Sequence, residues 1–361
     1  MFVKISQKIA TKRKDEMKLT KSKINPILSP NPENQWEERC VLNPAVIYDD
    51  ERQKFVMLYR AAGDDKRHKI VLGLAESDDG IHFTRVSDKP IFSPDNAEPD
   101  GGCVEDPRLT KLGDLYYVTY ASHPYAPGQY WLEPYIEGVT KPPMYLEEGD
   151  IRGEIMPFFA KENLTVSCLA ATKDFRHFKR FGRITEARVD DRDVVLFPEV
   201  IGGKYVLITR PKFKNVPGLK MPSIWLSFRD DLVEYVKPEL LITGKEWWET
   251  QRIGAGTVPI LTKYGWFFLY HGVDDNGIYR VGALILDKDN PLKVIARTKD
   301  FIMEPDQQFE LEGIYNGCVF PTGTVVKDGI LYVYYGCADK YVGLATANFD
   351  ELLEHVMKDR V

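Results

Sequence analysis

The stretch Glu105-Asp106-Pro107-Arg108-Leu109 is one of five segments in which a proline stands near the start of an expected β-strand. An aromatic-rich strand and then a strand of small residues follow each segment at similar intervals. The first strands are expected at 43–47, 105–109, 196–200, 257–261 and 319–323, the second at 54–60, 115–121, 204–210, 266–271 and 331–337, and the third at 71–75, 167–171, 223–227, 281–285 and 342–346. A repeated sheet that cannot bury its own faces must stack on its neighbours. The sequence therefore predicts an all-β fold, a five-bladed β-propeller whose blades protect each other's edges.

The repeats place most of the chain in one domain with an extension at each end. We expect the propeller over 25–348, an N-terminal helical extension over 1–24, and a C-terminal helix over 349–361, where apolar residues recur at helical spacing. In the second blade, 122–163 form a long insertion rich in aromatic residues and proline. A loop of this length is expected to act as a lid, here a wall of a carbohydrate site. Packing for stability, or contact with another subunit, is the alternative.

The composition narrows the class of protein. A formal net charge of −6 gives no reason to expect nucleic acid as a partner, and no apolar run is long enough for a secretory signal or a membrane span. The five cysteines are scattered and form no C-x-x-C pair, which predicts reduced thiols in a cytoplasmic protein. The N-terminal extension and the insertion offer surfaces on which a homo-oligomer could form.

The first strands of a propeller line its central channel, so polar residues at their starts are expected to point into one funnel. These residues, with those that end the second strands, are Asn43, Arg60, Glu105, Asp106, Arg108, Arg192, Arg210, Arg252, His271 and Asp339. Because an unpaired buried charge is costly, their origin in different blades favours a bound polar ligand.

Each of these residues also has a plainer interpretation. Asp106 precedes a proline and could be an ordinary turn aspartate. Arg60 and Arg210 could form structural ion pairs with it or with Asp193. His271 could be a core histidine whose ring nitrogens are satisfied by the protein.

The usual rival chemistries lack their motifs. The sequence has no G-x-x-x-x-G-K-[ST] phosphate loop, no G-x-S-x-G elbow and no H-E-x-x-H helix, and Gly254-Ala255-Gly256 does not continue into a dinucleotide fingerprint. We therefore expect neither a cofactor nor a catalytic metal, although carboxylates in a propeller channel could hold calcium.

Motifs found in order along the blades are similar to those of glycoside hydrolase family 130, the inverting β-mannoside phosphorylases and related β-mannosidases. They are Glu105-Asp106-Pro107-Arg108, the run at 191–198, Arg210-Pro211, Gly254-Ala255-Gly256, and the runs at 270–273, 279–283 and 334–339. The resemblance covers essentially the whole propeller.

The resemblance implies roles for residues in and beside these motifs. Asp106 would be the proton donor, acting through the 3-hydroxyl group of the bound mannosyl unit. The residues that would hold the mannosyl ring in subsite −1 are Asn43, Arg60, Arg108, Arg192 and Asp339. Those that would bind phosphate are Arg210, Arg252, His271 and Tyr279. Residues 192 and 252 are arginine, whereas the family often has lysine at these positions. The planar guanidinium group of arginine can bind two oxygens at once.

The implied activity is inverting phosphorolysis of β-mannosides to α-mannose 1-phosphate and a shortened acceptor, with inorganic phosphate as co-substrate. An inverting hydrolase needs a second carboxylate to activate water, whereas a phosphorylase needs one acid and a cationic pocket for phosphate. One alternative is a β-mannosidase on the same fold with Glu199, Glu304 or Glu312 as the base. The other is a non-catalytic sugar-binding propeller, since a fold alone does not establish a function.

Overall fold

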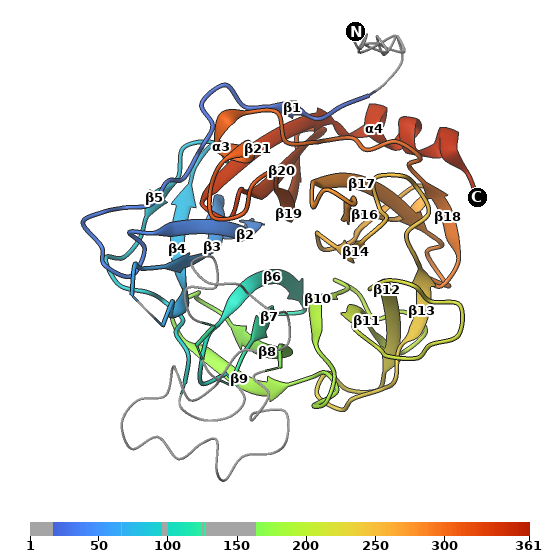
Figure 1. Ribbon diagram of the computed structural model, residues 1–361, viewed down its shortest axis with the longest axis horizontal. Helices are drawn as coiled ribbons and strands as arrows, with labels where there is room; N and C mark the ends of the chain where they lie inside the picture. The colour runs from blue at the N-terminus through green and yellow to red at the C-terminus, as the bar shows by residue number, and fades with distance from the viewer. Residues whose placement is uncertain (1–16, 66, 96–99, 125, 128–163) are drawn as a thin grey trace, which may run out of the picture.

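The computed structural model describes residues 17–361 apart from 66, 96–99, 125 and 128–163. Its strands form five antiparallel sheets arranged as blades around a common centre (Figure 1). The predicted all-β, five-bladed propeller is confirmed. No helix in the described part of the chain is long and apolar enough to cross a membrane.

In each blade the strands follow one another from the centre outward. The first blade contains β2 (Cys40–Asp49), β3 (Lys54–Ala62), β4 (Ile70–Ser77) and β5 (Thr84–Arg85). The second contains β6 (Glu105–Leu112), β7 (Leu115–Ser122), β8 (Val166–Thr172) and β9 (Phe178–Arg183). The third contains β10 (Asp191–Leu196), β11 (Tyr205–Pro211), β12 (Ile224–Arg229) and β13 (Glu239–Ile242).

The last two blades are less regular. The fourth contains β14 (Arg252–Ala255), β16 (Gly265–Val273), β17 (Tyr279–Leu286) and β18 (Val294–Arg297), and β15 (Ile260–Thr262) also pairs with β16. The fifth contains β19 (Val319–Lys327), β20 (Ile330–Cys337), β21 (Tyr341–Asn348) and, at its outer edge, β1 (Thr20–Lys21). The helical elements are α3 (Gln308–Leu311), α4 (Phe349–Val356) and a 3₁₀ turn at Met357–Asp359.

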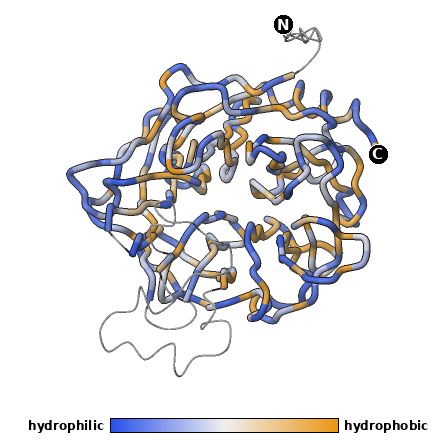
Figure 2. Tube along the Cα trace, viewed as in Figure 1, coloured by the Kyte–Doolittle hydropathy of each residue, from blue (hydrophilic) through white to orange (hydrophobic). Residues whose placement is uncertain are grey.

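Apolar side chains hold neighbouring blades together. Five buried clusters each combine residues of two adjacent blades: Val56 with Val118, Leu169 with Val194, Val206 with Phe268, Leu269 with Val333, and Phe55 with Tyr334. Hydrophobic segments accordingly run through the interior of the ring in Figure 2. Burial between blades, rather than within one blade, is therefore what closes the fold.

A β-bulge recurs in the first strands of blades one to three. The register with the second strand shifts between Leu42 and Ala45, between Glu105 and Arg108, and between Arg192 and Val195. The residues inside these bulges, Asn43, Asp106 and Asp193, have positive φ values of 44°, 51° and 56°. Asn and Asp tolerate this region better than other non-glycine residues, and a bulge re-aims a side chain. The bulges therefore turn one polar side chain per blade toward the centre.

Two of the predicted first strands are misplaced. The segment 196–200 was expected to begin a strand, but β10 begins at Asp191 and ends at Leu196. The segment 257–261 spans the gap between β14 and β15. Proline has no N–H group for the ladder, so Pro198 and Pro259 lie where strand pairing is interrupted. The bulge, and not the proline, is the feature that the first three blades share.

The chain ends match the prediction on one side only. Helix α4 forms within the expected C-terminal segment, and the Asn348 side chain caps it by accepting a hydrogen bond from the Glu351 N–H. The N-terminal helix is wrong for 17–24, where the structure has β1 and a turn at 23–24, and where the Leu19 and Ser22 N–H groups bond to carbonyls of other segments. Residues 1–16, and the insertion at 125 and 128–163, lie outside the described residues.

Candidate active site

A cavity of about 690 Å³ lies at the centre of the ring, within the range of about 300–1,000 Å³ that is usual for ligand sites. All five blades contribute to its wall. The predicted site residues that line it are Asn43, Arg60, Asp106, Arg192, Arg210, Arg252, Tyr279 and Asp339. Glu105, His123, Asp193, Lys212, Tyr315 and Phe320 line it as well. The structure therefore brings together most of the polar residues that the strand starts predicted.

Asp106 projects from the bulge of β6 and is held by two neighbours from the first blade. Its Oδ1 atom accepts a hydrogen bond from Asn43 Nδ2 at 2.7 Å and from Arg60 Nη1 at 2.9 Å. The side chain keeps 19% of its surface exposed. Both bonds end on one oxygen, so the carboxyl group has a fixed orientation while its second oxygen remains for a ligand.

Arg60 is held in turn by Glu105, the residue before Asp106. Arg60 Nη1 lies 2.9 Å from Glu105 Oε2, and His123 Nε2 lies 3.3 Å from Glu105 Oε1. Burial raises the pKa of Glu105, but the charges of Arg60 and His123 outweigh it, so the pKa lies below the usual value. Glu105 is therefore a permanent carboxylate that fixes the position of Arg60.

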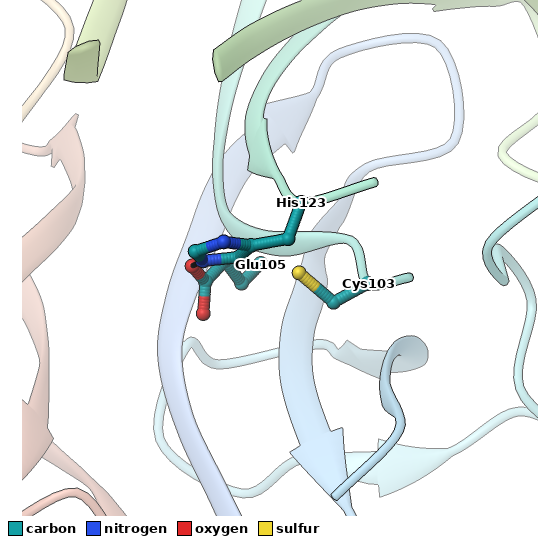
Figure 3. Close-up of side chains that lie close together, drawn as sticks. All are labelled: Cys103, Glu105 and His123. Atoms are coloured by element: carbon teal, nitrogen blue, oxygen red, sulfur yellow. Dashed lines mark ion pairs between the residues drawn. The ribbon is translucent and has the colours of Figure 1, made fainter. Parts of the chain in front are cut away.

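Cys103, Glu105 and His123 form a compact group where β6 begins and β7 ends (Figure 3). One possible ligand atom from each lies within 4.8 Å of the others, and these are ligand types that zinc accepts. Burial, however, raises the pKa of the Cys103 thiol well above its usual value. Arg60 already pairs with the carboxylate. The group therefore fits a support for Arg60 better than it fits a metal centre.

The third blade adds basic side chains to the cavity wall. Arg210 Nε lies 2.6 Å from Asp193 Oδ2. Arg192 donates from Nε and Nη2 to the two oxygens of Asp190, both at 3.1 Å, and Lys212 Nζ lies 3.6 Å from Asp190 Oδ1. Burial raises the pKa of Asp190, but Arg192 and Lys212 bring it below the usual value. Asp193 and Asp190 thus each hold a basic side chain in place, and that side chain still lines the cavity.

The fourth blade extends this basic surface. Arg252 Nη2 donates to the Tyr279 hydroxyl oxygen at 2.6 Å. Burial raises the pKa of Tyr279, so the tyrosine remains a neutral hydroxyl. Arginine, lysine and tyrosine side chains from two blades are therefore arranged to bind an anion with several oxygens.

Arg108 and His271 lie beneath the wall and do not line the cavity. Arg108 is 1% exposed and donates to the backbone oxygens of Asp106 and Ala255, at 2.7 and 3.3 Å, and to that of Gly256. His271 is also 1% exposed, and its ring packs 4.6 Å from that of Phe320. Both side chains therefore lie between blades, behind the residues that line the cavity.

The side chain of His271, behind the cavity wall, differs in charge from the basic side chains of the wall. Burial lowers the pKa of His271 well below its usual value, and Arg210, Arg252 and Arg108 lower it further. The imidazole is therefore neutral at physiological pH. His271 therefore adds no positive charge to that of the arginine and lysine side chains that line the cavity.

Asp339 lines the cavity from the loop between β20 and β21, with a φ of 52°. Its pKa is raised from 3.8 to about 6, because burial and, to a smaller extent, the nearby carboxyl group of Asp106 outweigh the opposing effect of Arg60. Asp339 therefore changes its charge close to neutral pH.

Sequence reasoning missed several lining residues. Lys212 follows β11 two residues after Arg210, and alternate residues of a strand share a face, so this spacing could have revealed it. Tyr315 lies in the loop before β19, where its hydroxyl donates to the Gly277 oxygen at 2.9 Å. Such a loop position carries no periodic signal.

The proposed bases of the hydrolytic alternative lie elsewhere. Glu199 lines a separate cavity with Thr110 and Val258. Glu304 accepts a hydrogen bond from Arg280 Nε at 3.1 Å, and Glu312 lines a third cavity with Lys340. None of the three glutamates lines the central cavity. They are therefore not placed to activate a water molecule beside Asp106.

Comparison with known proteins agrees with this geometry. A family described as beta-1,4-mannooligosaccharide phosphorylase matches residues 4–130 and 153–358. The 1,2-beta-oligomannan phosphorylase of Thermoanaerobacter sp. (strain X514) is 36% identical over 93% of this chain and 99% of its own length. The beta-1,2-mannobiose phosphorylase of the same organism is 34% identical over 91% and 96%.

Solved structures share the fold. The beta-1,2-mannobiose phosphorylase of Listeria innocua, in complex with beta-1,2-mannobiose, superposes with a TM-score of 0.75 at 24% identity, covering 95% of this chain and all of the other. With a family match over most of its length and relatives above 30% identity, the chain belongs to glycoside hydrolase family 130.

Proposed function

We propose that this protein cleaves β-mannosides by inverting phosphorolysis, with inorganic phosphate as the second substrate. The observation that supports this most directly is that one cavity is lined both by the Asp106 carboxyl group and by basic residues of blades three and four. A phosphorylase needs this pair of features, because phosphate arrives as an anion and requires positioning more than activation.

The residues divide into two groups by position. Asp106 donates the proton to the leaving glycosidic oxygen through the 3-hydroxyl group of the mannosyl unit, while a phosphate oxygen attacks the anomeric carbon from the opposite face. The C1–O bond to the acceptor breaks, a C1–O bond to phosphate forms with inversion, and α-mannose 1-phosphate leaves. The mannosyl ring is held by Asn43, Arg60, Arg192 and Asp339, and phosphate by Arg210, Arg252 and Tyr279, with Lys212 added to this group.

Arg108 and His271 act from behind the wall in this proposal. Arg108 fixes the backbone oxygens of Asp106 and Ala255, and His271 packs against Tyr279 at a ring distance of 5.4 Å. They position residues that touch the substrates.

The relatives suggest which substrates to test first. Two relatives at 36% and 34% identity are named for β-1,2-linked mannosides, whereas the family description names β-1,4-linked ones. We propose β-1,2-mannobiose and short β-1,2-oligomannans as the first candidates, with β-1,4-mannobiose as the comparison. The five buried, unpaired cysteines agree with action in a reducing, cytoplasmic compartment.

The decisive experiment incubates the purified protein with each disaccharide, with and without phosphate. We expect mannose 1-phosphate to form only with phosphate, and its anomeric configuration, read by NMR, to be α. Equal release of free mannose under both conditions would reject phosphorolysis and support the β-mannosidase alternative. Binding of the sugar with no turnover in any condition would support a non-catalytic propeller.

A further inference from the structure

Asp193 occupies the position in blade three that Asp106 occupies in blade two. Both lie inside a bulge of the first strand, with φ values of 56° and 51°. Non-glycine residues held in this region store strain and cluster at functional sites. Asp193 also lines the central cavity, although its side chain is only 3% exposed.

Three basic side chains meet at the Asp193 carboxylate. Arg210 Nε lies 2.6 Å from Oδ2, His271 Nε2 lies 3.8 Å from Oδ2, and Arg108 Nη2 lies 3.9 Å from Oδ1. All of them are at least nine-tenths buried. Because His271 is neutral, the single negative charge of Asp193 offsets one of the two positive charges of Arg108 and Arg210, and its shortest contact is with Arg210.

Gly254 in β14 makes room for this cluster. A Cβ atom at 254 would lie 2.2 Å from Asp193 Oδ2, 2.5 Å from His271 Cε1 and 2.9 Å from Arg210 Cδ. Each of these atoms belongs to a side chain of the cluster and none to the backbone. The fourth blade therefore carries a residue without a side chain at the point where the Asp193 cluster needs the space.

We propose that Asp193 is a positioning residue that holds the Arg210 guanidinium in the orientation that binds phosphate. The ion pair with Asp193 is made by Nε, at the inner edge of the guanidinium, while Arg210 lines the cavity. The terminal nitrogens of Arg210 are thereby directed to an anion in the cavity, and their placement is fixed before phosphate arrives. This inference rests on the phosphorolysis proposed above.

Steady-state kinetics of Asp193→Asn test the proposal, with phosphate and the cleaved β-mannoside varied separately. Misplacing a binding group by about 1 Å can cost on the order of 100-fold, so we expect the KM for phosphate to rise about tenfold or more. The KM for the mannoside should stay within about twofold, because Glu105 pairs with the sugar-binding Arg60 and Asp190 with Arg192. Glu37→Gln, which breaks the buried Glu37–Arg85 ion pair away from the cavity, is the control and should leave both KM values unchanged.

Gly254→Ala is the second variant, because it displaces the same side chains without removing a charge. It should raise the KM for phosphate in the same selective way, and this result remains informative where Asp193→Asn folds poorly. In the double variant with Arg210→Gln, Asp193→Asn should add little to the loss that Arg210→Gln causes alone.

A phosphate-dependent wild type whose KM for phosphate is unchanged by both variants would overturn the role of Asp193. An equal rise of both KM values would also overturn it, since that indicates a general loss of structure. If instead the wild-type rate does not depend on phosphate, the proposed phosphorolysis itself is wrong, so the two failures are distinguishable.

Discussion

A single bulged residue in each of three strands determines what faces the centre of the ring. Asn43, Asp106 and Asp193 are short polar residues at positive φ, and each reaches a partner in the cavity wall or behind it. Replacing aspartate by asparagine keeps the backbone tolerance for this conformation while removing the proton-donating group. These positions are therefore suited to substitutions that separate chemistry from folding.

Asp106→Asn should abolish most phosphorolysis without unfolding the protein. General acid catalysis contributes about 10²–10⁴ in rate, so we expect kcat to fall by that factor. Release of mannose 1-phosphate gives the rate, and calorimetric titration should show that the mannoside still binds. Asp114→Asn, in the exposed hairpin after β6, is the matched control and should be as active as wild type. An Asp106→Asn enzyme of normal kcat would remove Asp106 from the mechanism.

Ionisation of Asp339 should lower the free energy of unfolding as the pH rises through about 6. Its pKa in the folded protein, about 6, lies above 3.8, so the folded state holds the proton more tightly than the unfolded state does. The resulting stabilisation is complete below about pH 3.8 and is lost as Asp339 ionises. We therefore expect the Tm of Asp339→Asn to rise relative to the Tm of wild type as the pH increases from 5 to 8. The variant should also lose its activity.

Thermal melts at several pH values check this expectation. Asp78→Asn, whose side chain is 83% exposed, serves as the control and should follow the wild-type curve. A difference in Tm between Asp339→Asn and wild type that does not change across pH 6 would contradict the raised pKa of Asp339.

Among the elements, the strands could be predicted from sequence and the bulges could not. Aromatic second strands and small third strands follow from local composition, and β3, β7 and β20 form within two residues of the predicted bounds. A bulge depends on hydrogen bonds across two strands, which no local pattern reveals. The segment 196–200 was misplaced for this reason.

The inability of local sequence patterns to reveal bulges also explains why some side chains at the site were placed wrongly. A shift of one residue in a strand turns a side chain to the opposite face. Arg108 directly follows the bulge at Asp106, and so it points between blades and not into the cavity. Asp106 itself was identified through its motif, whereas the cluster around Asp193 required side chains from three strands that are distant in sequence.

The N-terminal strand should contribute measurably to stability through Lys21. Lys21 Nζ lies 2.6 Å from Glu310 Oε2, and Glu310 is fully buried in α3. Removing one partner leaves a buried carboxylate supported by Tyr335, so Lys21→Ala should cost about 1–3 kcal/mol of unfolding free energy. Chemical denaturation measures this, and Lys54→Ala, at an exposed ion pair, should match wild type. A Lys21→Ala protein as stable as wild type would show that β1 is held by its backbone bonds alone.

The protein should be active without a metal ion bound to Cys103, Glu105 and His123. Arg60 pairs with the Glu105 carboxylate, and a cation at Cys103 and His123 would have to displace it. Dialysis against a chelator should therefore leave the phosphorolysis rate unchanged. Loss of activity that zinc restores would instead identify the Cys103 group as a metal centre.

At the scale of the whole molecule, the five inter-blade clusters make the ring one cooperative unit. All five cysteines are buried and unpaired, and they lie in blades one, two and five. We expect a thiol reagent to modify none of them in the native protein, and all five together as denaturant unfolds the ring. The thiol titration should coincide with tryptophan fluorescence, and separate phases would show that blades open independently.

Closure of the ring through β1 and β21 pairs the first strand of the described residues with the last. Thr20 pairs with Thr346, and Asp339 reaches the cavity only when blade five is in place. A nascent chain on the ribosome therefore has no complete cavity until blade five has been synthesised. Products truncated before Asp339 would be inert, because they would lack the part of the cavity wall that blade five supplies.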